Sequence, residues 1–233
     1  MDDIPDHKFF LLVGLKKISL EALNLKNEIF FTKKTLINDF SNKENYKTLE
    51  NFLNKNIFEI EKKLNKYVKD IYLIIDYNNF ISVELSVKYN FKGVSFNQNL
   101  MNNKLIDLKN QFKKTIGNYE IIHIIINKFI IDGIIYSTLP KEINYDDLSI
   151  EVRFICLEND IIENFKKILS KYQISIKRIL FNDYLRDFKN SHNQNIFKIA
   201  NNILNGLNHN EIFLVNKSIK KEGFFEKFFN FFN

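Results

Sequence analysis

The sequence predicts an α+β fold, and three observations lead to this prediction. Short runs in which apolar and polar residues alternate are typical of strands, and longer runs with apolar residues three or four positions apart are typical of helices. From residue 80 onward these runs follow the order strand, helix, strand, strand, helix, strand, which indicates helices layered on a sheet. The 233 residues, of which 45% are hydrophobic, suffice for one large domain or two small ones.

The first 79 residues are expected to form three strands, one long helix and a fourth strand. Residues 9–13 form an apolar run, and strand-like patterns follow at 18–22 and 28–37. Between residues 46 and 68, apolar side chains recur at helical spacing, which predicts an amphipathic helix of about six turns. A strand is expected at 71–75.

Residues 80–185 are expected to form a second, compact unit of one sheet and two helices. The expected elements are strands at 80–91, 119–131, 149–157 and 174–181, and helices at 100–116 and 161–172. The expected core residues of this unit are Ile121, Ile125, Phe129, Val152 and Phe154. Residues 186–219 become polar and are expected to be a linker, with a short helix at 196–207.

Composition narrows the class of protein. The net charge of +6 is mild, the lysines are interleaved with Glu and Asn, and the Lys-Gly-aromatic signature of small RNA-binding sheets is missing, so we expect no nucleic-acid partner. A single cysteine excludes an intrachain disulfide and a cysteine zinc site. The acidic start argues against a secretory signal. No apolar run approaches the roughly 20 residues of a transmembrane helix, which predicts a soluble or membrane-surface protein.

The motifs of the common enzymes are missing, so we expect no catalytic residue, no metal and no cofactor. The four histidines lack metal-ligand spacing, and His123, on an apolar strand face, is expected to be structural. Cys156 is expected to be a small buried apolar residue. The six glycines are too far apart to form a phosphate-binding loop, which needs closely spaced glycines for backbone contact with the phosphates.

The carboxyl-terminal residues 220–233 have the most distinctive pattern in the chain. At about 100° per residue, six phenylalanines from Phe224 to Phe232 fall within an arc of about 160° on a helical wheel, opposite Glu226, Asn230 and Asn233. This pattern predicts an amphipathic helix lying in a membrane surface, with nearby lysines at the headgroups. The alternative is a last helix that packs against protein. The expected membrane-binding residues are Lys220, Lys221, Phe224, Phe225, Lys227, Phe228, Phe229, Phe231 and Phe232.

Two stretches resemble FtsA, the bacterial actin homologue that tethers the division ring to the inner membrane. One runs through His123, the turn Asp132-Gly133, Pro140 and the strand 148–155, and is similar to the inserted subdomain of that family. The other, the ending Gly223-Phe224-Phe225-Glu226-Lys227-Phe228-Phe229, is similar to its membrane-targeting helix. The resemblance covers mainly residues 70–185 and 217–233, and it implies that residues 1–79 are a remnant of an actin-like lobe.

The chain also departs from the FtsA pattern. Lys16 and Ile18 stand where the family has the Asp and Gly of its phosphate loop, and the chain is too short for the second actin lobe. We therefore expect neither ATP binding nor FtsZ binding through the family's usual pocket.

Together these observations predict a non-enzymatic adaptor in bacterial cell division. The adaptor would sit on the cytoplasmic face of the cell membrane at the division site, and its partners would be FtsZ or downstream division proteins, with self-association also open. The alternative is a soluble protein-interaction or nucleic-acid-binding module whose Phe-rich tail docks on a partner.

Overall fold

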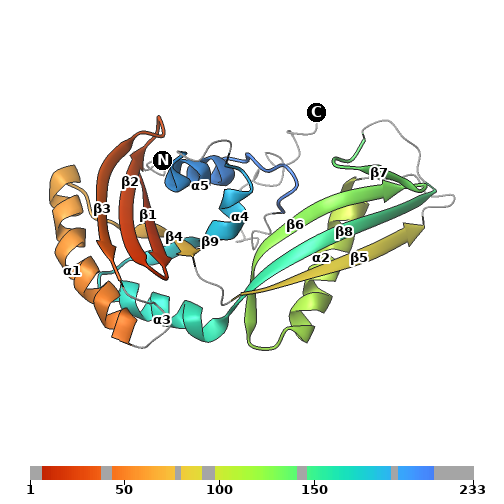
Figure 1. The fold of residues 1–233 in the computed structure, drawn as a ribbon. Helices are drawn as coiled ribbons and strands as arrows, with labels where there is room; N and C mark the ends of the chain where they lie inside the picture. Colours follow the sequence, from red (N-terminus) through yellow and green to blue (C-terminus); the bar gives the residue numbers. More distant parts are fainter. Residues whose placement is uncertain are drawn as a thin grey trace.

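The computed structural model describes residues 7–37, 44–76, 80–90, 98–140, 146–189 and 194–212. These residues form two sheets with helices, so the predicted α+β class is confirmed (Figure 1). The first sheet has the strand order β3-β2-β1-β4-β9, and the second has the order β5-β8-β6-β7.

The first sheet is mixed. It contains β1 (His7–Gly14), β2 (Lys17–Asn24), β3 (Ile29–Leu36), β4 (Asp70–Asp76) and β9 (Ser175–Phe181). Strands β1, β2 and β3 pair antiparallel, whereas β4 runs parallel to both β1 and β9. The three inner strands β2, β1 and β4 are buried almost continuously, as expected for strands covered on both faces.

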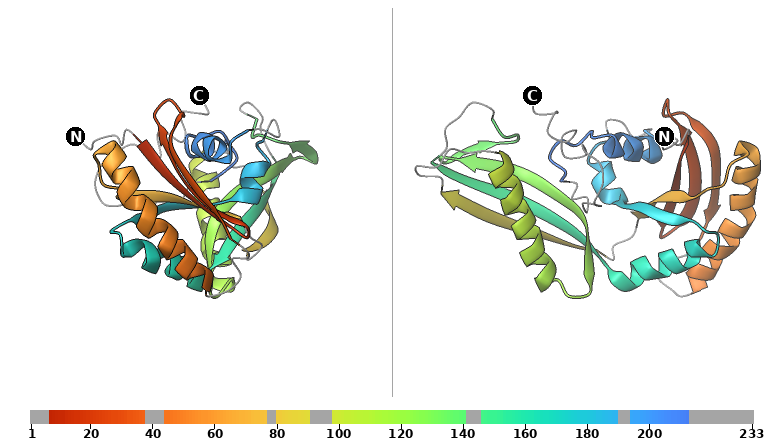
Figure 2. Two further views of the ribbon diagram at one scale, coloured as in Figure 1. Left: turned by 60° about the vertical axis from the view of Figure 1, so that its left-hand side comes forward. Right: turned by 180° about the vertical axis from the view of Figure 1, so that it is seen from behind.

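Helices cover both faces of the first sheet (Figures 1 and 2). Helices α1 (Glu44–Leu64) and α3 (Asn159–Ser170) lie on one face and contact each other through the rings of Tyr46 and Phe165, whose centroids are 5.9 Å apart. Helices α4 (Asn182–Arg186) and α5 (Ile196–Leu204) lie on the other face, where Phe197 packs edge-on against Phe10 of β1. The first core therefore draws on both the beginning and the end of the described chain.

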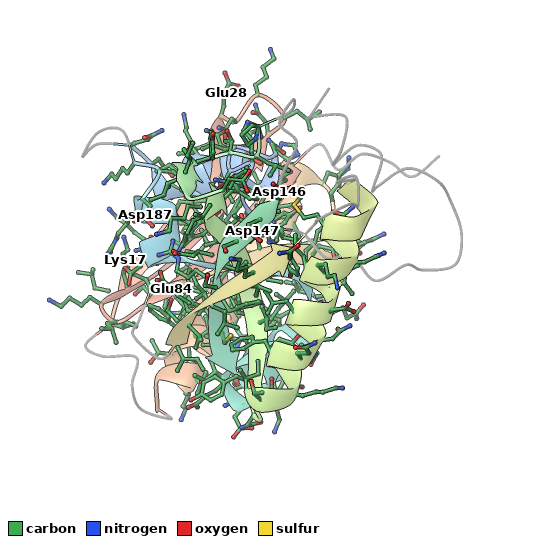
Figure 3. All side chains as sticks on the ribbon, turned by 90° about the vertical axis from the view of Figure 1, so that its right-hand side faces the viewer. Lys17, Glu28, Glu84, Asp146, Asp147 and Asp187 are labelled. Atoms are coloured by element: carbon green, nitrogen blue, oxygen red, sulfur yellow. The ribbon has the colours of Figure 1, made fainter. Side chains whose placement is uncertain are left out.

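The second sheet is antiparallel and is open on one face. It contains β5 (Phe80–Asn90), β6 (Tyr119–Ile131), β7 (Ile134–Tyr136) and β8 (Asp147–Glu158), and α2 (Gln98–Thr115) packs on it. Figure 3 shows α2 on one side of this sheet, with Glu84 and Asp187 on the opposite side. On the open face Lys128 pairs with Glu151 at 2.9 Å, and Asn127 donates to Glu84 at 3.0 Å. This face therefore carries polar and charged side chains that pair with one another.

The expected domain division was wrong in two respects. The helix and strand expected to complete the unit at 80–185 belong to the first sheet, because β9 pairs in parallel with β4 and α3 packs in the first core. The expected linker at 186–219 is also wrong over its described part, since Ile199, Ala200 and Ile203 of α5 are fully buried in the first core. Of the five expected core residues of the second unit, Phe129, Val152 and Phe154 lie in its core and Ile121 packs against it, whereas Ile125 joins the first core.

Helix α5 starts where it does because Asn195 caps it. The Asn195 side chain accepts hydrogen bonds from the backbone N–H groups of Phe197 at 2.8 Å and Lys198 at 3.4 Å. Such a cap satisfies donors that otherwise have no partner in the first turn of a helix. The cap fixes the helix that leads into the carboxyl-terminal segment described below.

Candidate functional site: the clamp on the carboxyl-terminal segment

All nine residues predicted to bind the membrane lie outside the described residues. The structure does describe the five residues Asn208–Ile212, from which the chain continues toward them. These five residues follow α5 and cross to β6 of the second sheet (Figure 1). This segment, hereafter the root segment, connects the first core with the second sheet.

The root segment pairs with β6 along its backbone. The N–H of Ile126 donates to the carbonyl of Asn210 at 2.9 Å, and the N–H of Ile212 donates to the carbonyl of Ile124 at 2.8 Å. Between these bonds, Ile125 and Glu211 form an antiparallel bridge. The root segment thus extends the second sheet by a short length at the side of β6 that faces away from β8.

The Glu211 side chain is the centre of a buried polar cluster. Its carboxylate is only 1% exposed and accepts from Nδ1 of His123 at 2.6 Å, from the hydroxyl of Tyr184 at 2.7 Å and from the guanidinium of Arg178. These three partners come from β6, α4 and β9 respectively. Glu211, His123, Arg178 and Tyr184, hereafter the Glu211 cluster, therefore join the root segment to both sheets.

The hydrogen bonds determine which nitrogen of His123 carries the proton. The backbone N–H of Phe181 donates to Nε2 of His123 at 3.2 Å, so Nε2 must be an acceptor and Nδ1 must hold the hydrogen that Glu211 accepts. Burial lowers the pKa of His123, and the charges of Arg178 and Arg153 act in the same direction, against Glu211, which raises it. His123 is therefore a neutral donor at neutral pH.

Glu211 is ionised in the same cluster. Burial alone would raise the pKa of its carboxyl, but the hydrogen bond from His123, the charge of Arg178 and the hydrogen bond from Tyr184 together lower it. The carboxylate in turn, together with burial, raises the pKa of the Tyr184 hydroxyl, which stays protonated and donates. Asn208 of the root segment donates to the Tyr184 oxygen at 2.9 Å and completes the network.

The cluster is a clamp. Its carboxylate accepts from three donors, and no member of the cluster lines the cavity at the start of β1 or the neighbouring cavity beside Tyr172. The prediction that His123 is structural is confirmed, since both ring nitrogens have partners. The prediction for Cys156 is confirmed too, because it is fully buried and burial raises the pKa of its thiol to about 12.

Sequence analysis missed Glu211, Arg178 and Tyr184. The available signal was weak: Glu211 ends a polar stretch from Asn205 to Asn210 and has the pattern of a surface residue. Its partners lie between 27 and 88 positions away along the chain. No local pattern brings such residues together.

The two residues that depart from the FtsA phosphate loop lie at the first hairpin. Lys16 is exposed in the turn between β1 and β2, and Ile18 is fully buried in β2 opposite Val13. A side chain at Gly14 would meet Asp76 of β4, whose Cβ and Oδ2 lie 3.1 Å from the position of the added Cβ atom. The end of β4 therefore lies directly beside the end of β1 at this hairpin.

Comparison with known proteins gives structural similarity only. Neither the family models nor the curated proteins yield a match to this chain. Among solved structures, the cytoplasmic domain of EpsL, an inner-membrane component of the type II secretion system of Vibrio cholerae, is 9% identical, with a TM-score of 0.38 over 77% of this chain and 58% of that one. The PilM–PilN type IV pilus biogenesis complex is 7% identical, with a TM-score of 0.46 over 78% and 49%.

A third solved structure is a Bacteroides thetaiotaomicron protein of actin-like ATPase fold and unknown function. It is 13% identical, with a TM-score of 0.35 over 81% of this chain and 58% of that one. The chain spans between about half and three fifths of the length of these chains, and the similarity concerns the backbone arrangement alone.

In the part of the chain that the structure describes, no group of three or more His, Cys, Asp or Glu side chains is arranged to hold a metal ion. None of the helices in these residues combines the length and the apolar character that crossing a bilayer requires.

The Glu211 cluster predicts a loss of stability on the acid side of neutrality. Because the pKa of His123 is lower in the folded protein than its ordinary value of 6.5, the unfolded chain binds the extra proton first as the pH falls below that value. The lowered pKa of Glu211 also reduces the free energy of unfolding as the pH falls, but it does so at lower pH. We expect the free energy of unfolding, measured by urea denaturation, to fall as the pH drops from 7 to 5.

The substitution His123→Asn isolates the contribution of the histidine. The Asn side-chain N–H can donate to Glu211 from near the position of Nδ1, but it does not titrate. The variant should lose stability overall, because Phe181 N–H loses its acceptor, and its stability should change less between pH 7 and pH 5. An undiminished pH dependence in this variant would contradict the assignment of the titration to His123.

Proposed function

We propose that this protein is a peripheral membrane adaptor whose carboxyl-terminal residues bind the cytoplasmic surface of the cell membrane. The observation that carries the proposal is the arc of six phenylalanines between Phe224 and Phe232, with Lys220 and Lys221 upstream. The Glu211 cluster supports it, because any force on the membrane-bound end of an adaptor reaches the folded body through the segment that connects them. The root segment, which is clamped to both sheets, is suited to that task.

The expected attachment is reversible. Full burial of a Phe side chain is worth about 1.5–3 kcal/mol, and interfacial burial about half of that. Ordering the segment costs about 1 kcal/mol per residue or more. The difference is a few kcal/mol for one copy, so firm attachment needs several copies that act together.

The assembly that the adaptor serves is, in our proposal, the bacterial division ring. The resemblance of 121–155 and 223–229 to FtsA supports this choice, and the candidate partners are FtsZ and downstream division proteins. The protein would act without catalysis at the division site, and self-association is a further candidate interaction. The competing function is a protein-interaction module whose Phe-rich tail docks on a protein partner instead of a lipid surface.

The test is sedimentation with vesicles, using the full chain and a chain that ends at Lys217. The full chain should sediment with vesicles that contain phosphatidylglycerol, and the shortened chain should remain in the supernatant. The double substitution Lys220→Gln and Lys221→Gln should weaken binding in low salt by roughly 1 kcal/mol per lysine and have less effect in high salt, where the attraction is already screened.

The division role is tested separately on the same vesicles. Purified FtsZ should sediment with vesicles only when the full chain is present. Vesicle binding without FtsZ recruitment would retain the membrane adaptor and remove the division ring as its assembly. Absence of vesicle binding at low salt would favour the protein-docking alternative.

A further inference from the structure

A basic cavity lies at the end of the first sheet where β1 begins. It has a volume of about 560 Å³ and is formed by the first residues of β1, the end of α1, the start of β4 and Lys177 of β9. Four of the residues that line it are lysines, against a single carboxylate. The lysines are Lys8, Lys66, Lys69 and Lys177, and the carboxylate is that of Asp70.

The lining of this cavity carries more positive than negative charge. Among the described residues, Lys8, Lys69 and Lys177 form no salt bridge to a carboxylate within 4 Å. The Asp70 carboxylate accepts from the hydroxyl of Ser175. Lysines that outnumber the carboxylates around a cavity favour an anion in the space between them.

Lys8 is held in position by neutral groups. Its ammonium donates to the side-chain oxygens of Asn201 and Asn205 on α5, at 2.8 Å each. Burial lowers the pKa of Lys8, and the nearby charge of Lys177 lowers it further. Such an ammonium gains most from an anionic partner, because an anion would offset both the burial and the repulsion.

The walls of the cavity add an apolar side. Leu64, Tyr67 and Tyr72 line it, and the ammonium of Lys177 lies 5.9 Å from the ring centroid of Tyr72. The volume exceeds what a single phosphate group fills. The cavity lies at the opposite end of β1 from the first hairpin, which is the position of the phosphate loop in the FtsA pattern.

We propose that this cavity binds a phosphate-bearing molecule, with the phosphate among Lys8, Lys69 and Lys177 and its organic part against Tyr67 and Tyr72. A soluble phosphorylated metabolite and a phospholipid headgroup share this chemistry. The experiment below distinguishes these two sources.

The first measurement is calorimetric titration of the full chain with inorganic pyrophosphate and with glycerol 3-phosphate. Asp2, Asp3 and Asp6 directly precede His7, so the titration is repeated with these three residues changed to Asn, which removes carboxylates that could compete. We expect Lys177→Gln and Lys69→Gln each to weaken binding at least tenfold. Lys8→Gln should do the same, but it also removes a contact with α5, and so the other two variants decide the result.

The matched control is Lys166→Gln on α3, because Lys166 pairs with Glu163 on the exposed surface away from the cavity. This control should bind pyrophosphate as the unchanged chain does. No heat of binding at millimolar pyrophosphate, in either the unchanged or the Asp→Asn chain, overturns the proposal. Equal weakening by Lys166→Gln and Lys177→Gln overturns it too, since the binding then follows net charge alone.

The second measurement separates the two sources of phosphate. A chain with Phe228→Glu and Phe229→Glu, which lacks the proposed tail attachment, is sedimented with phosphatidylcholine vesicles with and without phosphatidic acid. Retention that requires phosphatidic acid and is lost with Lys177→Gln assigns the cavity to a lipid headgroup. Binding of the soluble phosphates without retention assigns it to a soluble metabolite.

Discussion

Changing Phe228 and Phe229 together to Glu is expected to abolish sedimentation with anionic vesicles. The two positions fall at about 40° and 140° on the helical wheel, inside the arc of phenylalanines, so both carboxylates would enter the apolar side. The favourable free energy of burying two Phe side chains at the interface is lost. In addition, the two new carboxylates must either lose their water or displace the helix from the surface. The combined effect exceeds the few kcal/mol that one copy gains by binding.

A matched control separates this effect from simple charge repulsion. Asn230→Glu together with Asn233→Glu adds the same two negative charges at about 240° and 180°, outside the phenylalanine arc. This control should bind more weakly than the unchanged chain but should still sediment at low salt. If the Phe→Glu pair and the Asn→Glu pair of substitutions abolish binding equally, the attachment is electrostatic and the phenylalanine arc has no special role.

The same double Phe→Glu variant also tests the competing interpretation. A membrane-binding tail contributes nothing to the folded body, so the urea midpoint of the variant should match that of the unchanged chain. A large loss of stability with vesicle binding intact would mean that the phenylalanines pack against protein. The membrane adaptor would then lose its main support.

Removal of the Glu211 carboxylate is expected to have the largest effect on stability. Glu211→Gln leaves Arg178 without its counter-charge in a position where the Glu211 side chain is only 1% exposed. Breaking a buried ion pair on one side typically costs about 3–5 kcal/mol, a large part of the stability of a domain. Urea denaturation should show the loss, and Glu163→Gln, which breaks an exposed pair on α3, should change stability by less than about 1 kcal/mol.

A second substitution shows whether the cost is that of an unpaired charge. Arg178→Met in the Glu211→Gln background removes the guanidinium that has lost the Glu211 carboxylate, and it should recover part of the lost stability. Replacing both members of a buried pair is often nearly neutral, whereas removing one is not. If the double variant is instead less stable by the full sum of the two single effects, the residues do not act as a pair.

The elements of this fold could be predicted from the sequence, but their partners could not. The period of apolar residues located most strands and helices to within a few residues, whereas the short elements β7 and α4 were not predicted. The assignment of 174–181 to the second sheet was wrong, because its parallel partner lies about 100 residues away in the sequence. A usable signal did exist: Ile179-Leu180-Phe181 is a continuous apolar run, like Leu73-Ile74-Ile75 of β4, whereas β5 alternates and so belongs to a sheet with an open face.

The Glu211 cluster could not be predicted from the sequence for a related reason. His123 stood out because it interrupts an apolar strand, and its structural role followed from that position. The identity of its partner depended on the path of the chain after α5, which the polar stretch before Glu211 made resemble a linker. The burial of the Glu211 carboxylate depends on three hydrogen-bond donors that lie far away in the sequence, and the residues next to Glu211 do not reveal it.

The parallel pairing of β4 with β9 bears on the order in which the chain folds. Residues 77–174 separate these two strands, so their pairing must close a loop of about 100 residues, which costs conformational entropy. Strands β5, β6, β7 and β8 pair within a shorter stretch of the chain. During synthesis from the amino terminus, all of the second sheet leaves the ribosome before β9 does. We therefore expect the second sheet to form early and to shorten the effective loop, with β9 added afterwards. Glu211 is made later still, so its cluster would close only after both sheets exist and would secure a nearly complete structure.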